Sequence, residues 1–94
     1  MIRFVWDSRK AAANARKHGI AFEEAATVFG DPLSLTVTDA EHSKDEIRLV
    51  TMGAATSGRI LVVAHVDRGD ETRIISARKA AAREKRQYHD ETEK

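Results

Sequence analysis

The feature that most constrains the fold is a pair of β segments joined by a short turn. Residues 60–64 read Ile-Leu-Val-Val-Ala, an apolar run whose length and β-branched composition are typical of a buried strand. Arg68 and Gly69 follow as a tight-turn signal, and residues 71–77 return as a second strand segment. The pattern predicts a β-hairpin over this part of the chain.

Two further strands are predicted before this hairpin. Between residues 33 and 38, leucine and valine alternate with serine and threonine, which is the period of a half-buried strand. A polar loop at 39–45 separates this segment from another strand at 47–52. The four segments follow one another without an intervening helix, and we therefore expect an antiparallel meander.

Helical signals occupy the first third of the chain. Asp7 or Ser8 can act as the N-cap of an alanine-rich helix over 9–17, and Gly19 is placed to end it as residue C′. A second helix is predicted over 22–29 because apolar side chains recur there on one helical face. These side chains are Phe22, Ala25, Ala26 and Phe29.

A short strand at 3–6 and a final helix at 79–90 complete the order of elements. The predicted fold class is α+β: a short N-terminal strand, two helices, a four-strand antiparallel meander and a C-terminal helix, with the helices against one face of the sheet. A chain of 94 residues has room for one core of modest size. We therefore expect a single domain over 1–94.

Composition excludes several classes of site. The chain has no cysteine, which rules out disulfides, thiolate metal sites and thiol nucleophiles. Its four histidines, His18, His42, His65 and His89, lack ligand spacing, and the acids near His42 suggest a metal site only weakly, so we expect neither a metal nor another cofactor. With no membrane-length apolar stretch and no signal-peptide h-region, the expected location is the cytoplasm.

Charge is distributed unevenly, although the formal net charge is only +1. Acidic residues predominate between 31 and 47, whereas basic residues predominate between 68 and 88. The basic residues of the latter segment are Arg68, Arg73, Arg78, Lys79, Arg83, Lys85 and Arg86. This third of the chain is either a phosphate-binding face or a solvated helix with ion pairs along it.

The expected hairpin register places His65 opposite Thr72 and Asp67 opposite Asp70. Side-chain alternation then puts one polar set on an open face and leaves the more apolar face for the helices. The predicted open-face set is Leu61, Val63, His65, Thr72, Ile74, Ser76 and Arg78. A slip of one residue would instead bring Arg73 beside His65.

Two residues of this predicted surface suggest chemistry. His65 is either a general acid or base near neutral pH or a half-buried histidine bonded to the backbone. Arg78 lies where the final helix begins, and it is either a surface or capping arginine or a bidentate phosphate clamp. In the second case the backbone N–H groups at the helix start would assist it.

Nearly the whole chain resembles the BrnT family. The matching motifs, in order, are Phe4-Val5-Trp6-Asp7, Lys10, Asn14, Lys17-His18-Gly19, Phe22-Glu23-Glu24-Ala25, Phe29-Gly30-Asp31-Pro32, His42-Ser43, Glu46, Arg48, Arg73-Ile74-Ile75-Ser76-Ala77-Arg78-Lys79-Ala80, Glu84 and Tyr88. Their joint order makes the resemblance more specific than any one of them.

The resemblance implies a toxin of a type II toxin–antitoxin pair with a RelE-like fold. It implies RNA cleavage that inhibits translation, neutralisation by a DNA-binding BrnA-like antitoxin, and contact with operator DNA only through that antitoxin. Metal-free cleavage needs a base for the 2′-hydroxyl, cations for the phosphorane and an acid for the leaving oxygen.

The residues assigned to this chemistry fall into two sets. The expected catalytic set is Arg78 for transition-state charge, His65 for proton transfer and Arg73, where the role of His65 rests on its position in the strand alone. The expected RNA-binding set is Lys17, His18 and Arg48. A site that uses only cations is a rival mechanism. The alternative function is a non-catalytic binding module, an inactive toxin homologue that acts only through complex formation with its antitoxin.

Overall fold

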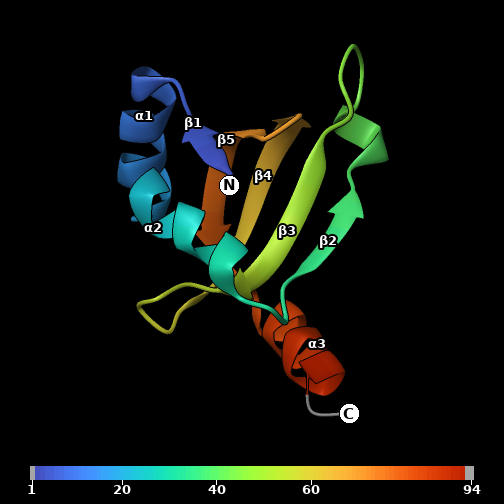
Figure 1. Ribbon diagram of the computed structural model, residues 1–94. Coiled ribbons are helices and arrows are strands. Elements are labelled where there is room, and N and C mark those ends of the chain that lie inside the picture. Colours follow the sequence, from blue (N-terminus) through green and yellow to red (C-terminus); the bar gives the residue numbers. More distant parts are fainter. Residues whose placement is uncertain (1, 93–94) are drawn as a thin grey trace.

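The computed structural model describes residues 2–92, which form a mixed five-stranded sheet with three α-helices (Figure 1). The elements are β1 (Arg3–Val5), α1 (Ser8–His18), α2 (Phe22–Ala26), a 3₁₀ turn η1 (Thr27–Gly30), β2 (Leu35–Thr38), a 3₁₀ turn η2 (Ala40–His42), β3 (Leu49–Ala54), β4 (Ile60–Arg68), β5 (Glu71–Lys79) and α3 (Ala82–Thr92). The spatial order is β1-β5-β4-β3-β2. Strands β2 to β5 form the antiparallel meander, and β1 pairs in parallel with β5. The predicted α+β class is confirmed. Within the described residues, no helix has both the length and the apolar character needed to cross a membrane.

The ends of α1 follow from local chemistry. The Asp7 carboxylate accepts hydrogen bonds from the backbone N–H groups of Arg9 at 2.8 Å and Lys10 at 3.2 Å, which makes Asp7 the N-cap. Gly19 adopts φ +69° after the last turn, and its N–H donates to the Ala15 carbonyl at 2.9 Å. This left-handed residue ends the helix and turns the chain toward α2.

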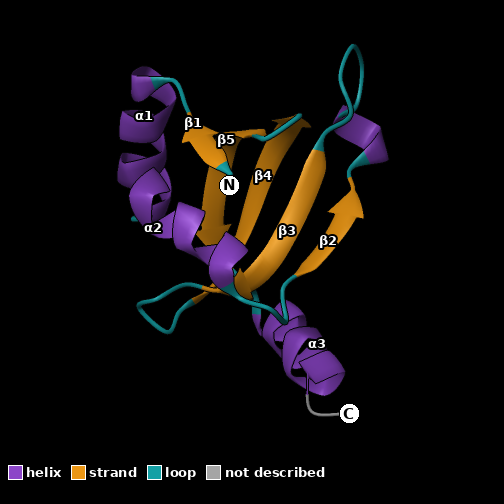
Figure 2. Ribbon diagram, in the orientation of Figure 1, coloured by secondary structure: helices purple, strands orange, loops and turns teal. Residues whose placement is uncertain are grey.

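Helices pack against both faces of the sheet, α1 and α2 against one and part of α3 against the other. In Figure 2, α3 lies at the lower end of the sheet. One face packs against α1, α2 and η1 around a core of Ile20, Phe22, Ala25, Val28, Ala55, Leu61, Val63, Ile74 and Ala77. We call this the covered face. On the opposite face, α3 contributes Tyr88 to a smaller cluster with Met52, Ile60, Val62 and Ala80. We call this the open face. The expectation that all helices lie against one face is therefore wrong for α3.

The β4–β5 register also differs from the prediction. The strands pair Arg68 with Glu71 and Asp67 with Thr72, so the turn is centred on Gly69 and Asp70. Gly69 has φ +61°, which a residue without a side chain adopts readily. His65 pairs with Ile74 and not with Thr72.

The predicted faces are wrong in two respects. The face of Leu61, Val63 and His65 is the covered face and not the open one, and a β-bulge moves Ser76 and Arg78 to the face opposite these residues. Ala64 pairs with Ser76 while His65 pairs with Ile74, which leaves Ile75 as an extra residue in β5. The extra residue reverses the alternation along β5. Thr72 and Ile74 therefore join Leu61, Val63 and His65 under the helices, whereas Ser76 and Arg78 join Val62 and Ala64 on the open face. His65 and Arg78 thus lie on opposite faces of the sheet.

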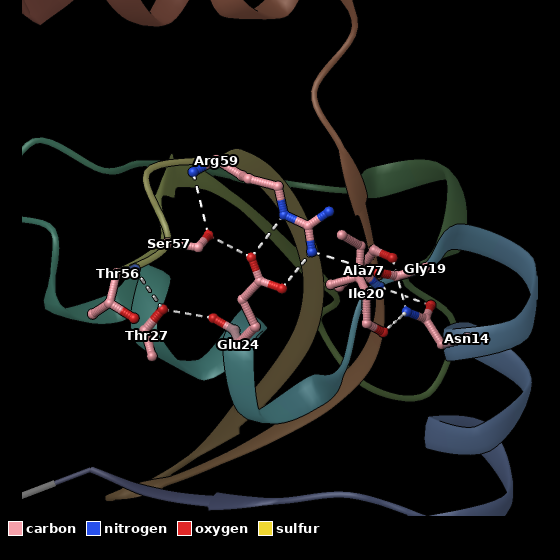
Figure 3. Close-up of polar contacts among 9 residues, drawn as sticks. All are labelled: Asn14, Gly19, Ile20, Glu24, Thr27, Thr56, Ser57, Arg59 and Ala77. Carbon is pink, nitrogen blue, oxygen red and sulfur yellow. Dashed lines mark hydrogen bonds and ion pairs between the residues drawn. The ribbon is translucent and has the colours of Figure 1, made fainter.

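Asn14 completes the edge of β5 beyond the short strand β1, whose pairing ends at Arg73. Its amide nitrogen donates to the carbonyls of Ala77 at 2.9 Å and Ile20 at 3.0 Å, and its oxygen accepts from the Ala77 N–H at 3.0 Å (Figure 3). The buried amide satisfies backbone groups that a neighbouring strand would otherwise pair. These bonds fix α1 against the strand that carries Arg78.

A junction around Asp31 holds α3 to the sheet. The Asp31 carboxylate accepts hydrogen bonds from the Tyr88 hydroxyl and, at 2.8 Å, from the Ala54 N–H. The bond to Asp31, together with burial, raises the pKa of Tyr88 to about 12. A Cβ at Gly53 would lie only 3.0 Å from the side chains of Val28 and Ser34. Glycine there lets the Asp31 turn approach β3 closely.

Candidate functional site

A pocket of about 270 Å³ lies on the open face of the sheet. Its apolar lining comes from Val50, Val62, Ala64 and Ala77, and its polar lining comes from His18, Asp39, His42, Arg48, Ser76 and Arg78. These polar residues belong to α1, η2 and its N-cap, the segment before β3, and β5. We call this the open-face pocket. Elements distant in the chain thus place two arginines and two histidines around one concavity.

Arg78 is positioned by its strand and by the start of α3. It pairs with Val62 across the β4–β5 ladder, and its Nη1 and Nη2 donate to the two Glu84 oxygens at 2.7 and 2.9 Å. These hydrogen bonds raise the pKa of Arg78 and lower that of Glu84. Glu84 Oε1 also accepts the Ala81 N–H at 2.8 Å, as in a helix capping box. Glu84 therefore occupies a helix-start N–H group of the kind predicted to assist Arg78.

Arg48 has unused hydrogen-bonding capacity. Its Nε is buried and has no hydrogen-bond partner among the described residues, and the nearest carboxylate oxygen, Asp39 Oδ2, is 3.9 Å away. A buried N–H group without an acceptor is unfavourable. The Nε atom itself is closed to solvent, whereas 27% of the Arg48 side chain is exposed, so a ligand would contact Arg48 through that exposed part. An anion in the pocket would lie beside this exposed part of the guanidinium side chain.

His42 is oriented by the same carboxylate. Its Nδ1–H donates to Asp39 Oδ2 at 2.9 Å, and its side chain is 58% exposed. The bond orients the ring, and Nε2 has no hydrogen bond within residues 2–92. Sequence reasoning selected neither His42 nor Asp39 as a site residue, and it noted only a weak metal signal near His42. The signal that could have identified His42 is its place in the matched motif His42-Ser43.

The three predicted RNA-binding residues lie close to this pocket. His18 and Arg48 line it directly. Lys17 lines an adjoining depression together with Lys10, Asn14, His18 and Ser76. The C-terminal turn of α1 therefore extends the positive surface away from Arg78.

The other two predicted catalytic residues lie elsewhere. Arg73 is exposed and pairs with Val5 and Val66, outside the residues that line the pocket. His65 is 1% exposed on the covered face and stacks edge-on against Phe29 at 4.8 Å between ring centroids. The bulge thus separates His65 from Arg78.

Both ring nitrogens of His65 already have partners. Nε2 is hydrogen-bonded to Thr51 Oγ1 at 2.7 Å and Nδ1 to Asp67 Oδ1 at 2.8 Å. Thr51 in turn is hydrogen-bonded to Thr36 at 2.8 Å. The ring therefore lies in a saturated network that links β2, β3 and β4 beneath the helices.

Comparison with known proteins adds two findings. Residues 6–84 match the family model described as "Ribonuclease toxin, BrnT, of type II toxin-antitoxin system". The fold is similar to that of the Brucella abortus ribonuclease toxin BrnT, known from a crystal structure at 1.1 Å, with a TM-score of 0.65 and 23% sequence identity. That match covers 86% of this chain and 99% of the other. No curated protein matches the sequence.

Proposed function

Because the chain belongs to the BrnT family of ribonuclease toxins of type II toxin–antitoxin systems, we propose that it cleaves RNA in the open-face pocket. The cleavage is endonucleolytic and independent of metal ions, it takes place in the cytoplasm, and it inhibits translation. A single domain over 1–94 carries the activity.

The observation that carries this proposal is the convergence of two arginines and a histidine from three separate segments. His18 from α1, Arg48 from the segment before β3 and Arg78 from β5 line the same pocket. Guanidinium groups match the oxygens of a phosphodiester, and they act strongly where water is partly excluded. The carboxylate that Arg48 faces, Asp39, lies 3.9 Å from its Nε, so Arg48 is held less tightly within the protein than Arg78 is by Glu84.

The proposed reaction is attack of the ribose 2′-oxygen on the adjacent phosphorus. His42 Nε2 accepts the 2′-hydroxyl proton, the P–O5′ bond breaks, and His18 donates a proton to the departing 5′-oxygen. The products are a 2′,3′-cyclic phosphate and a 5′-hydroxyl. Arg48 and Arg78 stabilise the charge on the non-bridging oxygens of the phosphorane, and each proton-transfer group contributes roughly 10²–10⁴-fold.

Glu84 orients Arg78 and leaves part of it free. A guanidinium has five N–H donors. Glu84 accepts two hydrogen bonds from Arg78, and the Lys79 carbonyl accepts a third at 3.3 Å. The remaining donors are available to a phosphate without loss of the ion pair, so the pair serves as a support for the clamp.

The same surface suits a BrnA-like antitoxin. Acidic or apolar side chains of the antitoxin would cover the open-face pocket and block entry of RNA, with Lys17 and Arg73 at the margin of the contact. A formal net charge of +1 gives this chain little attraction for duplex DNA, so operator DNA is bound only through the antitoxin.

The test uses purified protein and a single-stranded RNA labelled at both ends, in buffer with EDTA. We expect internal cleavage by the wild type and a loss of about 10²–10³-fold in rate for Arg78→Ala. The matched control is Arg83→Ala, an exposed arginine of α3 outside the lining of the open-face pocket, which should cleave normally. Absence of cleavage by soluble, folded wild type that binds its antitoxin would favour the non-catalytic binding module. Loss of rate in His42→Ala separates the acid–base mechanism from one that uses only cations.

A further inference from the structure

A second basic pocket, of about 370 Å³, lies beside another face of α3. It is lined by Gly58, Arg59, Ile60, Lys79, Lys85 and His89. Lys85 and His89 of α3 face this pocket, whereas Glu84 and Gln87 line a groove on the open face with Val50 and Val62. The two concavities therefore lie on different sides of the same helix, and all the titratable residues that line the second one are basic.

Arg59 lines one side of this second pocket, and hydrogen bonds hold its guanidinium in place. Its Nε donates to Glu24 Oε2 at 2.9 Å, its Nη2 donates to Glu24 Oε1, and Nη2 also reaches the Gly19 carbonyl at 3.4 Å (Figure 3). Ser57 donates to the same carboxylate. The guanidinium is thus held between α2 and the β3–β4 turn, and Glu24 balances its charge.

Lys79 and Lys85 supply charge that is not balanced in this way. Among residues 2–92, the ion pairs formed by lysine, arginine and histidine involve neither of them. Within the described part of the chain, neither ammonium group has a carboxylate within ion-pair distance. The carboxylate nearest to this pocket in the contacts described is Glu24, which is paired with Arg59 and whose pKa Lys79 also helps to lower. Such a site attracts an anion that can be held by point charges.

The end of β5 sets the position of the second pocket relative to the open-face pocket. Lys79 follows Arg78 directly, and successive strand residues point to opposite faces. Two alanines, Ala80 and Ala81, join β5 to α3, and Ala81 and the first residue of the helix, Ala82, are exposed. Because alanine side chains are small, this segment would not obstruct an RNA strand that passes from one pocket to the other.

We propose that the second pocket binds a backbone phosphate of the same RNA strand whose phosphodiester occupies the open-face pocket. This inference rests on the proposed function. A single strand carries one negative charge per nucleotide and is flexible enough to bend around residues 80–82. Lysine contacts to phosphate fix the register of the strand without reading its bases, so the contact is independent of sequence.

The test is binding of a fluorescent single-stranded RNA of 12 nucleotides, 2′-O-methylated throughout so that it cannot be cleaved, at several salt concentrations. The variant is Lys79→Ala with Lys85→Ala. The control is Arg83→Ala with Arg86→Ala, which removes the same charge from exposed positions outside both pockets. Each lost phosphate contact should reduce the slope of log K against log salt by about 0.7 and weaken binding about fivefold at 0.1 M salt.

The expected result is a reduced slope in the lysine variant and a smaller change in the arginine control, with equal thermal midpoints. Cleavage of the unmodified RNA should then show a raised KM and an unchanged kcat. Equal slopes in the two double variants would overturn the inference. It would also be overturned if the lysine variant bound RNA as the wild type does but lost binding of inorganic phosphate or of an acidic protein partner. If the wild type binds the RNA but never cleaves it, the proposed function fails while the salt slopes still decide the role of this pocket.

Discussion

The two faces of the sheet differ in how completely their buried polar side chains are hydrogen-bonded. On the covered face, the polar atoms of Asn14 and both ring nitrogens of His65 are hydrogen-bonded within the protein. On the open face, Arg48 Nε has no partner among the described residues. Buried groups that are fully satisfied stabilise one structure, whereas unused donors around a concavity are available to a ligand.

Two histidines illustrate this difference because each forms a hydrogen bond from Nδ1 to an aspartate. His65 Nδ1 lies 2.8 Å from an Asp67 oxygen, and His42 Nδ1 lies 2.9 Å from an Asp39 oxygen. Their side chains differ in access, at 2% and 58% exposed. A histidine–aspartate pair is therefore evidence for proton transfer only where a substrate can reach it.

The largest expected effect is on stability and comes from the covered face. Phe22→Ala removes a fully buried ring from the core and should lower the free energy of unfolding by about 3–5 kcal/mol. Urea denaturation followed by circular dichroism measures it. Leu33→Ala, at a half-exposed leucine, is the control and should stay within about 0.5 kcal/mol. Similar losses in the two variants would mean that the core is not where the structure places it.

The next effect is on activity and comes from the open face. Arg48→Ala should lower the rate of RNA cleavage by about 10²–10³-fold. The free energy of unfolding should stay the same or rise slightly, because the substitution removes a buried donor that has no partner. The control, Arg68→Ala, breaks an exposed ion pair with Glu46 and should leave the rate unchanged. A large loss of stability in Arg48→Ala would show that its role is structural.

The histidine pair tests the comparison directly. His65→Ala should lower the free energy of unfolding by about 1–3 kcal/mol, because Thr51 and Asp67 lose a partner, while cleavage per folded molecule is retained. His42→Ala should show the opposite result, with a slower rate and unchanged stability. Rates normalised to the folded fraction separate the two effects. If folded His65→Ala is inactive, the result would support the sequence-based assignment of His65 to proton transfer.

The smallest effect is a change in acid stability. Hydrogen bonds from Arg59 and Ser57 lower the pKa of Glu24 from 4.5 to about 2. The ionised carboxylate therefore stabilises the protein fully above about pH 4.5, and this contribution is lost as the pH falls toward 2. Glu24→Gln should flatten the decline in thermal midpoint over that window. The exposed neighbour Glu23→Gln is the control, and an identical profile in the two variants would contradict the assigned role of Glu24.

Sequence predicted the elements well because their signals are local. Asp7 and Gly19 end α1 by hydrogen bonds within a few residues, and the β strands follow from alternation along their own segments. The class of fold and the family followed from that order of elements and motifs. His18, Arg48 and Arg78 were selected from position and motif, and the structure brings them to one pocket.

What sequence could not supply depends on contacts between distant segments. The bulge at Ile75 is an extra residue in β5 that no composition signal marks, yet it decides which side chains share a face with Arg78. The place of α3 depends on Tyr88 reaching Asp31, which is 57 residues earlier. His42 comes near Arg78 only because η2 and the end of β5 border the same pocket.

The parallel pairing of β1 with β5 has a consequence for the order of events on the ribosome. Arg3 and its partner Glu71 are 68 residues apart, and β5 is the last strand to be made. At about 5–20 residues per second, the first strand waits roughly 3–14 s for the strand it pairs with. Arg78 emerges with that same strand. The open-face pocket is therefore incomplete until Arg78 has been synthesised, and Arg78 gains the support of Glu84 only when the first turn of α3 has followed.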